Sequence, residues 1–259
     1  MLEARALSLS RQGRLLVEAV SLRVVPGELN IVLGPNGAGK SSLLGMLAGL
    51  HAPSAGEAWM AGRPLRGQSA AQLARQRAVV EQNPLTPAGW STMELIQSGA
   101  YLLGDAGEAC RQAMELTCTA ELAQRQARTL SGGEQQRAHL ARALCQLLAS
   151  ADAERYLLLD EPTAALDFAM ADALLAQVAR ICRELNIGAL AVVHDLNLAL
   201  RHADNVLLLN EGRAAGFGPT PEIMRRETLE AVYGVRLAEL SSREHALRAF
   251  VPLPHPHQE

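Results

Sequence analysis

The stretch Gly34-Pro35-Asn36-Gly37-Ala38-Gly39-Lys40-Ser41 has the form G-x-x-x-x-G-K-[ST], a glycine-rich loop that binds phosphate groups. The apolar run Leu29–Leu33 precedes it and is typical of a buried parallel strand. Apolar residues recur at helical spacing from Ser42 to Leu50, so the loop opens a helix. This order of strand, loop and helix predicts a site for a nucleoside triphosphate.

The loop supplies three kinds of contact to a phosphate chain. Its glycines let consecutive N–H groups point inward at an anion. The helix N-terminus adds a partial positive charge, and Lys40 brings a full charge to the β- and γ-phosphates. We expect the Ser41 hydroxyl to coordinate Mg²⁺, and Ser42 completes the candidate nucleotide-binding residues of this motif.

Composition narrows the class of protein. The chain has 259 residues and a net charge of −3, enough length for a large core and no basic surface that would indicate nucleic acid as a partner. No apolar run is long enough to span a bilayer, and the first residues do not resemble a signal peptide. The four cysteines show no metal-binding spacing, so we expect buried thiols in a reducing compartment.

The rest of the sequence indicates an α/β protein with antiparallel strands before the phosphate loop and a helical segment after it. Alternating residues before the loop, such as Ala6–Ser10 and Val20–Val24, predict antiparallel strands. Helical periodicity dominates residues 83–149. Short apolar strands predicted for the core are 78–81, 156–159, 189–193 and 206–209, and a helix is predicted to start after an N-cap at Thr220.

Two acids, Asp160 and Glu161, end the apolar strand Tyr156–Leu159. Open α/β sheets place ligands at the carboxyl ends of their strands. We therefore expect Asp160 to hold Mg²⁺ and Glu161 to polarise a water molecule against the γ-phosphate. Two adjacent carboxylates also favour an elevated pKa for one of them.

A second phosphate cradle is predicted at Leu130-Ser131-Gly132-Gly133-Glu134-Gln135. Ser131 is an N-cap candidate with Glu134 as its capping-box partner. A capped helix alone does not explain two glycines, which are poor helix formers, in the first turn. A bare helix end binds phosphate, and since one triphosphate rarely needs two such cradles, the second is expected to serve a nucleotide held by a partner copy.

Two polar residues at other strand ends join the candidate site. His194 follows the strand 189–193 and can donate a hydrogen bond to a γ-phosphate oxygen from its neutral ring. Gln82 ends the strand 78–81 and can reach the metal or the attacking water. A structural role is the alternative for each residue taken alone.

These motifs, in this order, resemble the ATP-binding cassette (ABC) family of transporter ATPases. The resemblance implies a P-loop NTPase core with an N-terminal antiparallel β subdomain and an inserted helical subdomain. It assigns catalysis to Glu161, His194 and Gln82, and magnesium to Ser41, Gln82 and Asp160. ATP would be bound by the loop residues and, from a second chain, by Ser131, Gly132, Gly133, Gln135 and the D-loop residue Asp167. It implies a head-to-tail homodimer with ATP and Mg²⁺ between the chains.

Within the family, the segments around Leu73–Val80, Arg155–Thr163 and His194–Ala199 are similar to importers of haem, cobalamin and ferric siderophores. The segment Gly132–Arg142 and the pair Arg155-Tyr156 most resemble hemin import ATP-binding proteins. This branch implies an integral membrane permease dimer, a periplasmic or surface solute-binding protein as an indirect partner, and a peripheral location on the cytoplasmic face of the inner membrane. Alternatives are a cobalamin or ferric-siderophore importer ATPase, a soluble ABC protein of DNA repair or translation, and a small-molecule kinase.

Two features depart from the family pattern. The family stacks adenine on an aromatic residue near the end of the first strand, where this chain has Arg11, whose guanidinium can also stack on a purine. The segment 99–108, which would face the permease, is shortened. We expect the cassette domain to span residues 1–240, with the helical subdomain at about 83–149, and a partly disordered C-terminal extension over 241–259.

Overall fold

A mixed six-stranded sheet forms the centre of the molecule in the computed structural model, which describes residues 1–104, 106–242 and 247–254. The strand order is β10-β9-β3-β8-β7-β6, and every neighbouring pair is parallel except β10 with β9. Their bounds are β3 Leu29–Leu33, β6 Arg77–Val80, β7 Arg155–Asp160, β8 Ile187–Val192, β9 Asn205–Asn210 and β10 Arg213–Pro219. The four core strands predicted after the phosphate loop are present, with ends shifted by one or two residues.

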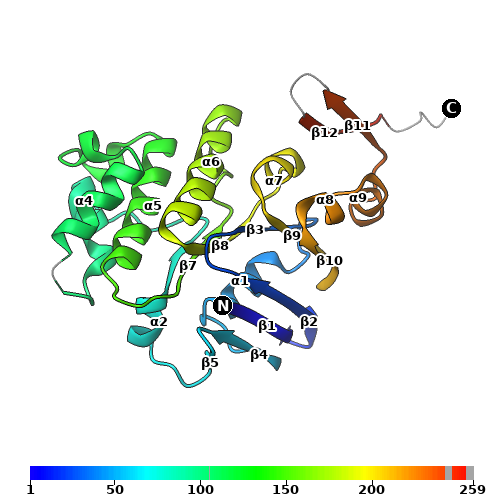
Figure 1. The fold of residues 1–259 in the computed structure, drawn as a ribbon, viewed down its shortest axis with the longest axis horizontal. Coiled ribbons are helices and arrows are strands. Elements are labelled where there is room, and N and C mark those ends of the chain that lie inside the picture. Colours follow the sequence, from blue (N-terminus) through cyan, green and yellow to red (C-terminus); the bar gives the residue numbers. More distant parts are fainter. Residues whose placement is uncertain (105, 243–246, 255–259) are drawn as a thin grey trace.

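A second, antiparallel sheet lies beside the central one (Figure 1). Its order is β2-β1-β4-β5, from β1 (Leu2–Arg11), β2 (Arg14–Val24), β4 (Ala55–Met60) and β5 (Arg63–Pro64). The turn between β1 and β2 has positive φ at Gln12 and Gly13, the backbone of a tight hairpin. The antiparallel strands predicted from the alternating pattern are confirmed, as is the N-terminal antiparallel β subdomain that the family resemblance implied.

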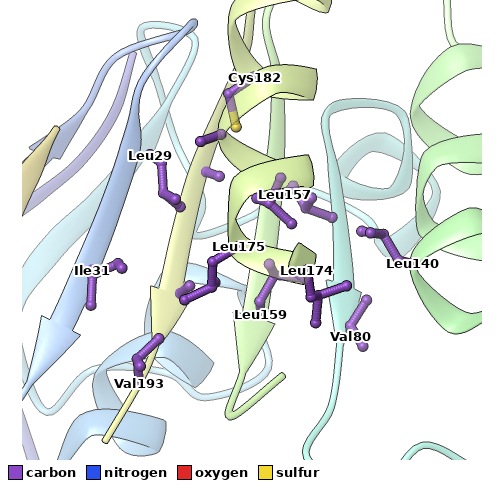
Figure 2. Packing of buried hydrophobic residues seen from close by; sticks show 14 of the residues in the cluster. Leu29, Ile31, Val80, Leu140, Leu157, Leu159, Leu174, Leu175, Cys182 and Val193 are labelled. Atoms are coloured by element: carbon purple, nitrogen blue, oxygen red, sulfur yellow. The ribbon is translucent and has the colours of Figure 1, made fainter. Parts of the chain in front are cut away.

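Helices cover both faces of the central sheet. Helix α1 (Lys40–Leu47) lies between the two sheets, and α6 (Phe168–Leu185) and α7 (Leu196–His202) cover the other face (Figure 1). The strands alternate between two cores: Leu157 and Leu159 face α6, whereas Tyr156 and Leu158 join the core around α1. Figure 2 shows Leu174 and Leu175 of α6 packed on Leu157 and Leu159. Burial on both faces explains why these strands read as continuous apolar runs.

The segment 83–149 is helical, as its periodicity predicted, and lies at one side of the sheet (Figure 1). Its elements are α3 (Thr92–Gln97), α4 (Gly107–Leu116), α5 (Gly132–Leu148) and the 3₁₀ turns Ser98–Ala100, Ala120–Leu122 and Ala127–Thr129. The expectation of four buried thiols is wrong here, because Cys110 of α4 and Cys145 of α5 form a disulfide. The sequence could not show this pairing, since the two cysteines are 35 residues apart and meet only because α4 and α5 pack together. Of the two free cysteines, Cys182 is buried and Cys118 is exposed.

Several elements differ from the sequence prediction. Thr220 is the first residue of α8 (Thr220–Ile223) rather than its N-cap, because its hydroxyl donates to the Ala203 carbonyl and Pro219 occupies the cap position. Helix α2 (Ala70–Gln76) was not predicted, although Ser69 and Gln72 form a capping box at its start. Helix α9 spans Arg226–Tyr233.

A C-terminal hairpin crosses the expected boundary between residues 240 and 241. Its strands are β11 (Leu237–Ser242) and β12 (Leu247–Pro252), and Asn197 of α7 exchanges hydrogen bonds with the Phe250 backbone. Of the extension over 241–259 that we expected to be partly disordered, residues 243–246 and 255–259 lie outside the described ranges. Among the helices described, none has the length and hydropathy to cross a membrane.

Candidate nucleotide-binding site

The phosphate loop connects β3 to α1, and its lysine lies inside the curl of the loop. Lys40 is 6% exposed, and its ammonium donates to the carbonyl oxygens of Gly34 (2.8 Å) and Pro35 (2.9 Å). Burial lowers the pKa of Lys40, while the Glu161 and Asp160 carboxylates act in the opposite direction. Lys40 is also the only lysine of the sequence.

The loop has little freedom to move away from the antiparallel sheet. Gly39 has a φ of +97°, and a Cβ added there would lie 2.4 Å from the Leu16 carbonyl oxygen of β2. Because neither that backbone conformation nor that contact tolerates a side chain, glycine is required at this position. A hydrogen bond from the Gly212 amide to the Ala38 carbonyl, 3.1 Å long, ties the loop to the β9–β10 turn as well.

Ser41 and Asp160 meet at the carboxyl edge of the central sheet. The Ser41 hydroxyl donates to Asp160 Oδ1 at 2.9 Å. Burial is the main cause that raises the pKa of Asp160; the nearby Glu161 charge also raises it, whereas Ser41, His194 and Lys40 oppose the rise. A half-buried carboxylate beside a hydroxyl is a pair of hard oxygen ligands that suits Mg²⁺.

Glu161 lies between two polar side chains from neighbouring strand ends. The Gln82 amide, after β6, donates to Glu161 Oε2 at 2.5 Å, and His194 Nε2, after β8, lies 2.8 Å from Glu161 Oε1. Glu161 itself has a φ of +49°, in the left-handed region, directly after β7. Gln82 and His194 therefore both contact the Glu161 carboxylate. The three residues proposed for catalysis follow three different strands of the sheet.

The capped helix predicted at residues 131–135 is present as the start of α5. Ser131 is the N-cap, and its backbone N–H donates to Glu134 Oε2 at 2.7 Å in a capping box. Glu134 also binds Arg125 (2.8 Å), and the Gln135 amide donates to the Leu130 carbonyl (2.9 Å). The side chains of Ser131, Glu134 and Gln135 thus bind Arg125, Leu130 and one another, so residues near it in the sequence hold the turn in place.

Asp167 caps helix α6 rather than binding within the Ser41–Asp160 cluster. Its carboxylate accepts a hydrogen bond of 2.9 Å from the Met170 N–H. The segment between Glu161 and Asp167 is turned back on itself by hydrogen bonds from Ala164 to the Glu161 carbonyl (3.2 Å) and from Leu166 to the Thr163 carbonyl (3.1 Å).

The structure adds a groove that sequence reasoning missed. It has a volume of about 410 Å³ and lies between the residues after β6 and the helical segment. His139 of α5 lines it and lies 3.0 Å from the Thr86 hydroxyl, and Arg142 of α5 donates to the Val79 carbonyl at 3.0 Å. Burial lowers the pKa of His139 to about 4. The sequence gives only a weak signal for these residues, since His139 and Arg142 lie on a helix that carries several other polar side chains.

The chain belongs to the ABC transporter family, whose model matches residues 17–164. Among curated relatives, the Hemin import ATP-binding protein HmuV of Burkholderia thailandensis is 39% identical, with 97% of this chain and 100% of the relative covered. HmuV of Hahella chejuensis is 42% identical, with 91% and 93% covered.

The fold also matches solved structures. A putative metal-chelate type ABC transporter in an inward-facing conformation is 26% identical, with a TM-score of 0.82, and covers 98% of this chain and 97% of its own. The dimeric structure of a bacterial ABC transporter cassette has a TM-score of 0.72 at 22% identity, covering 85% and 99%, and this likeness supports the fold alone.

Proposed function

We propose that this chain is the ATP-hydrolysing subunit of an ABC importer that energises hemin uptake through a separate membrane permease. The observation that carries the hydrolytic part is the shared carboxylate: Glu161 is held by Gln82 and His194 next to the Ser41–Asp160 pair. The family match and the hemin-import relatives support the transport part.

In this proposal the phosphate loop binds ATP and Glu161 acts on the attacking water. Lys40 exchanges its two carbonyl acceptors for phosphate oxygens, which offer it charge-assisted hydrogen bonds. Glu161 takes up a proton from the water as the water attacks the γ-phosphorus; the bond to the β–γ bridging oxygen breaks, and ADP is the leaving group. Gln82 and His194 fix the orientation of the carboxylate. Ser41, Asp160 and Gln82 would hold Mg²⁺, which neutralises charge on the phosphates.

We further propose that two copies pair head to tail around two nucleotides. The turn at Ser131, Gly132, Gly133 and Gln135 is preorganised by its own capping box and by the hydrogen bond from the Gln135 side chain to the Leu130 carbonyl. The first-turn amides and the helix dipole therefore suit a nucleotide bound to a partner chain. Asp167 would lie at the same contact.

The proposed permease contact is the groove beside Gln82. Exposed apolar side chains occur around it, at Leu50 (54% exposed) and Leu85 (90% exposed). Because Gln82 binds Glu161 and the residues that follow it line this groove, a permease segment seated here would be linked to the catalytic carboxylate. The chain would thus be a peripheral protein on the cytoplasmic face of the inner membrane, with the solute-binding protein an indirect partner.

The experiment that tests the proposal is reconstitution with the candidate permease in lipid vesicles. ATP hydrolysis is measured with the solute-binding protein loaded with hemin, cobalamin or a ferric siderophore, and the Glu161→Gln variant is the matched control. Stimulation by the hemin-loaded partner alone supports the proposal. Stimulation by another cargo replaces hemin, and co-purification with stoichiometric RNA or DNA in place of a permease contradicts the transport role.

A further inference from the structure

The groove beside Gln82 is lined by two half-buried arginine side chains that have no anionic partner. Arg77, at the start of β6, donates from Nε to the Ala48 carbonyl at 2.5 Å, and Arg142 of α5 donates to the Val79 carbonyl at 3.0 Å. A guanidinium carries five N–H donors. Within the part of the chain that the structure describes, each of these two guanidiniums makes one hydrogen bond and neither forms an ion pair. Most of their donors are therefore left for another molecule.

The other polar groups of the groove do not neutralise these two charges. Burial lowers the pKa of both guanidiniums, which nevertheless stay charged at neutral pH. His139 adds no charge near pH 7, because burial lowers its pKa to about 4. Among the described residues that line the groove, Glu81 is the one carboxylate, and its charge raises the pKa of Arg142 without an ion pair between the two. Two cations against one anion leave one uncompensated positive charge.

The groove also has an apolar rim, which makes this charge important for any occupant. Leu50 and Leu85 are exposed there, as is Trp90, with 39% of its surface accessible. A segment that packs against these side chains excludes water from the groove. A cation that loses its water without gaining an anion destabilises the complex, so a stable occupant has to bring a negative charge. A carboxylate fits this need, since its two oxygens accept parallel hydrogen bonds from one guanidinium.

We propose that Arg142 and Arg77 recognise a single acidic side chain, aspartate or glutamate, flanked by apolar residues in the permease segment that binds this groove. The proposal rests on the permease contact proposed above and adds the chemistry by which the chain selects its partner. One carboxylate neutralises the groove, because Glu81 already offsets one of the two arginines. A permease with a neutral or basic residue at this place would leave buried cations unpaired and would be rejected.

A double-mutant cycle across the interface tests the proposal. Equilibrium binding to the candidate permease in lipid nanodiscs is measured for the parent and for Arg142→Gln. Each is paired with permease variants in which the acidic residues of the cytoplasmic loops are replaced one at a time by their amides. Arg142→Gln is expected to weaken binding about 30-fold or more, the usual effect of breaking a buried charge pair. One permease variant is expected to show a similar loss, and combining it with Arg142→Gln is expected to add less than about threefold.

Matched variants separate recognition of a carboxylate from a general effect of charge or folding. Arg63→Gln removes the same charge from an exposed arginine outside the groove and is expected to bind as the parent does. Glu81→Gln is expected not to weaken binding, because it removes an anion that competes for the arginines. Arg142→Glu, combined with arginine in place of the identified permease acid, is expected to recover at least about tenfold of the affinity that either change loses alone. Such recovery shows that the variant chain is folded.

The outcomes distinguish this inference from the proposed function. Parent-like binding of both Arg142→Gln and Arg77→Gln to a permease that binds the parent overturns the recognition of a carboxylate and leaves the transport role standing. A loss in Arg142→Gln that no single acidic residue of the permease reproduces also overturns it, and assigns the arginines to backbone carbonyls or lipid phosphate. A parent chain that binds no candidate permease contradicts the transport role and the inference together.

Discussion

Ser41 and Asp160 are 119 positions apart in the chain, yet the serine hydroxyl donates to the aspartate at 2.9 Å. The first residue lies at the start of α1 and the second at the end of β7, two strands away from β3 in the sheet order β3-β8-β7. Parallel strands end at the same edge of a sheet, so the topology brings the loop, both acids, Gln82 and His194 to one place.

Replacing Glu161 by glutamine is expected to retain ATP binding and to lower hydrolysis by about 100-fold or more, because the amide cannot take up the proton of the attacking water. Equilibrium binding and steady-state phosphate release measure the two effects separately. His194→Gln is the companion variant, with a smaller expected loss because its hydrogen bond to the carboxylate can be retained. Normal turnover in Glu161→Gln would assign the water to another group.

Asp160→Asn is expected to stabilise the nucleotide-free chain while abolishing its response to Mg²⁺. Burial raises the pKa of Asp160, so the folded chain binds this proton more tightly than the unfolded chain. Below the pKa of Asp160 in the unfolded chain, this group does not lower the stability of the fold. As pH rises toward and past its pKa in the folded chain, the group destabilises the fold increasingly. The gain in urea midpoint should thus be present at pH 7 and disappear toward pH 3. If variant and parent were equally stable at pH 7, the ionised Asp160 carboxylate would not destabilise the nucleotide-free fold.

His139 is expected to make the protein sensitive to mild acid. Its folded pKa is about 4, below the value of 6.5 for an unperturbed histidine, so the unfolded chain binds the extra proton first. Stability is complete above about pH 6.5 and falls as pH drops toward 4, by about 3 kcal/mol at most. Urea unfolding of His139→Gln between these pH values should show a flatter dependence than the parent, and an identical slope would remove His139 as the cause.

Reduction of the Cys110–Cys145 disulfide is expected to lower the free energy of unfolding by roughly 3 to 4 kcal/mol, the loop-entropy value for a closed loop of this length. The measurement is urea unfolding with and without reductant. The Cys110→Ser/Cys145→Ser double variant without reductant should match the reduced parent. Cys182 is a free thiol and takes no part in the disulfide. The Cys182→Ala variant, measured with and without reductant, therefore serves as the control for nonspecific effects of the reductant. No difference on reduction would show that the bond contributes nothing to stability.

Features that depend on a few consecutive residues could be predicted from the sequence, whereas contacts between residues far apart in the chain could not. The phosphate loop, the two acids at the end of β7 and the capping box at Ser131 are each defined by a few consecutive residues. Helix α2 escaped prediction because Leu73 is its only buried residue, so its periodicity is weak. Thr220 was assigned as a cap because its sequence context suits one, whereas the tertiary bond to Ala203 uses its hydroxyl.

The contacts within the site join residues far apart in the chain, so the sequence did not predict them. Sequence placed Gln82, Glu161 and His194 at strand ends, but the sharing of one carboxylate depends on the order β8-β7-β6 of the strands. The same holds for the disulfide and for Met170 against Gly133, where each partner is an ordinary residue in its own helix. These pairs come into contact only because two helices pack against each other.

The burial of Lys40 has a chemical consequence for the whole surface. Every other strongly basic side chain in the sequence is an arginine, so the ammonium inside the loop is the only side-chain primary amine. Amine-selective acylating reagents therefore find one side-chain target, and acylating it would remove the charge that Lys40 brings to a phosphate group. The extent of labelling at Lys40 measures how often its ammonium leaves the Gly34 and Pro35 carbonyl oxygens.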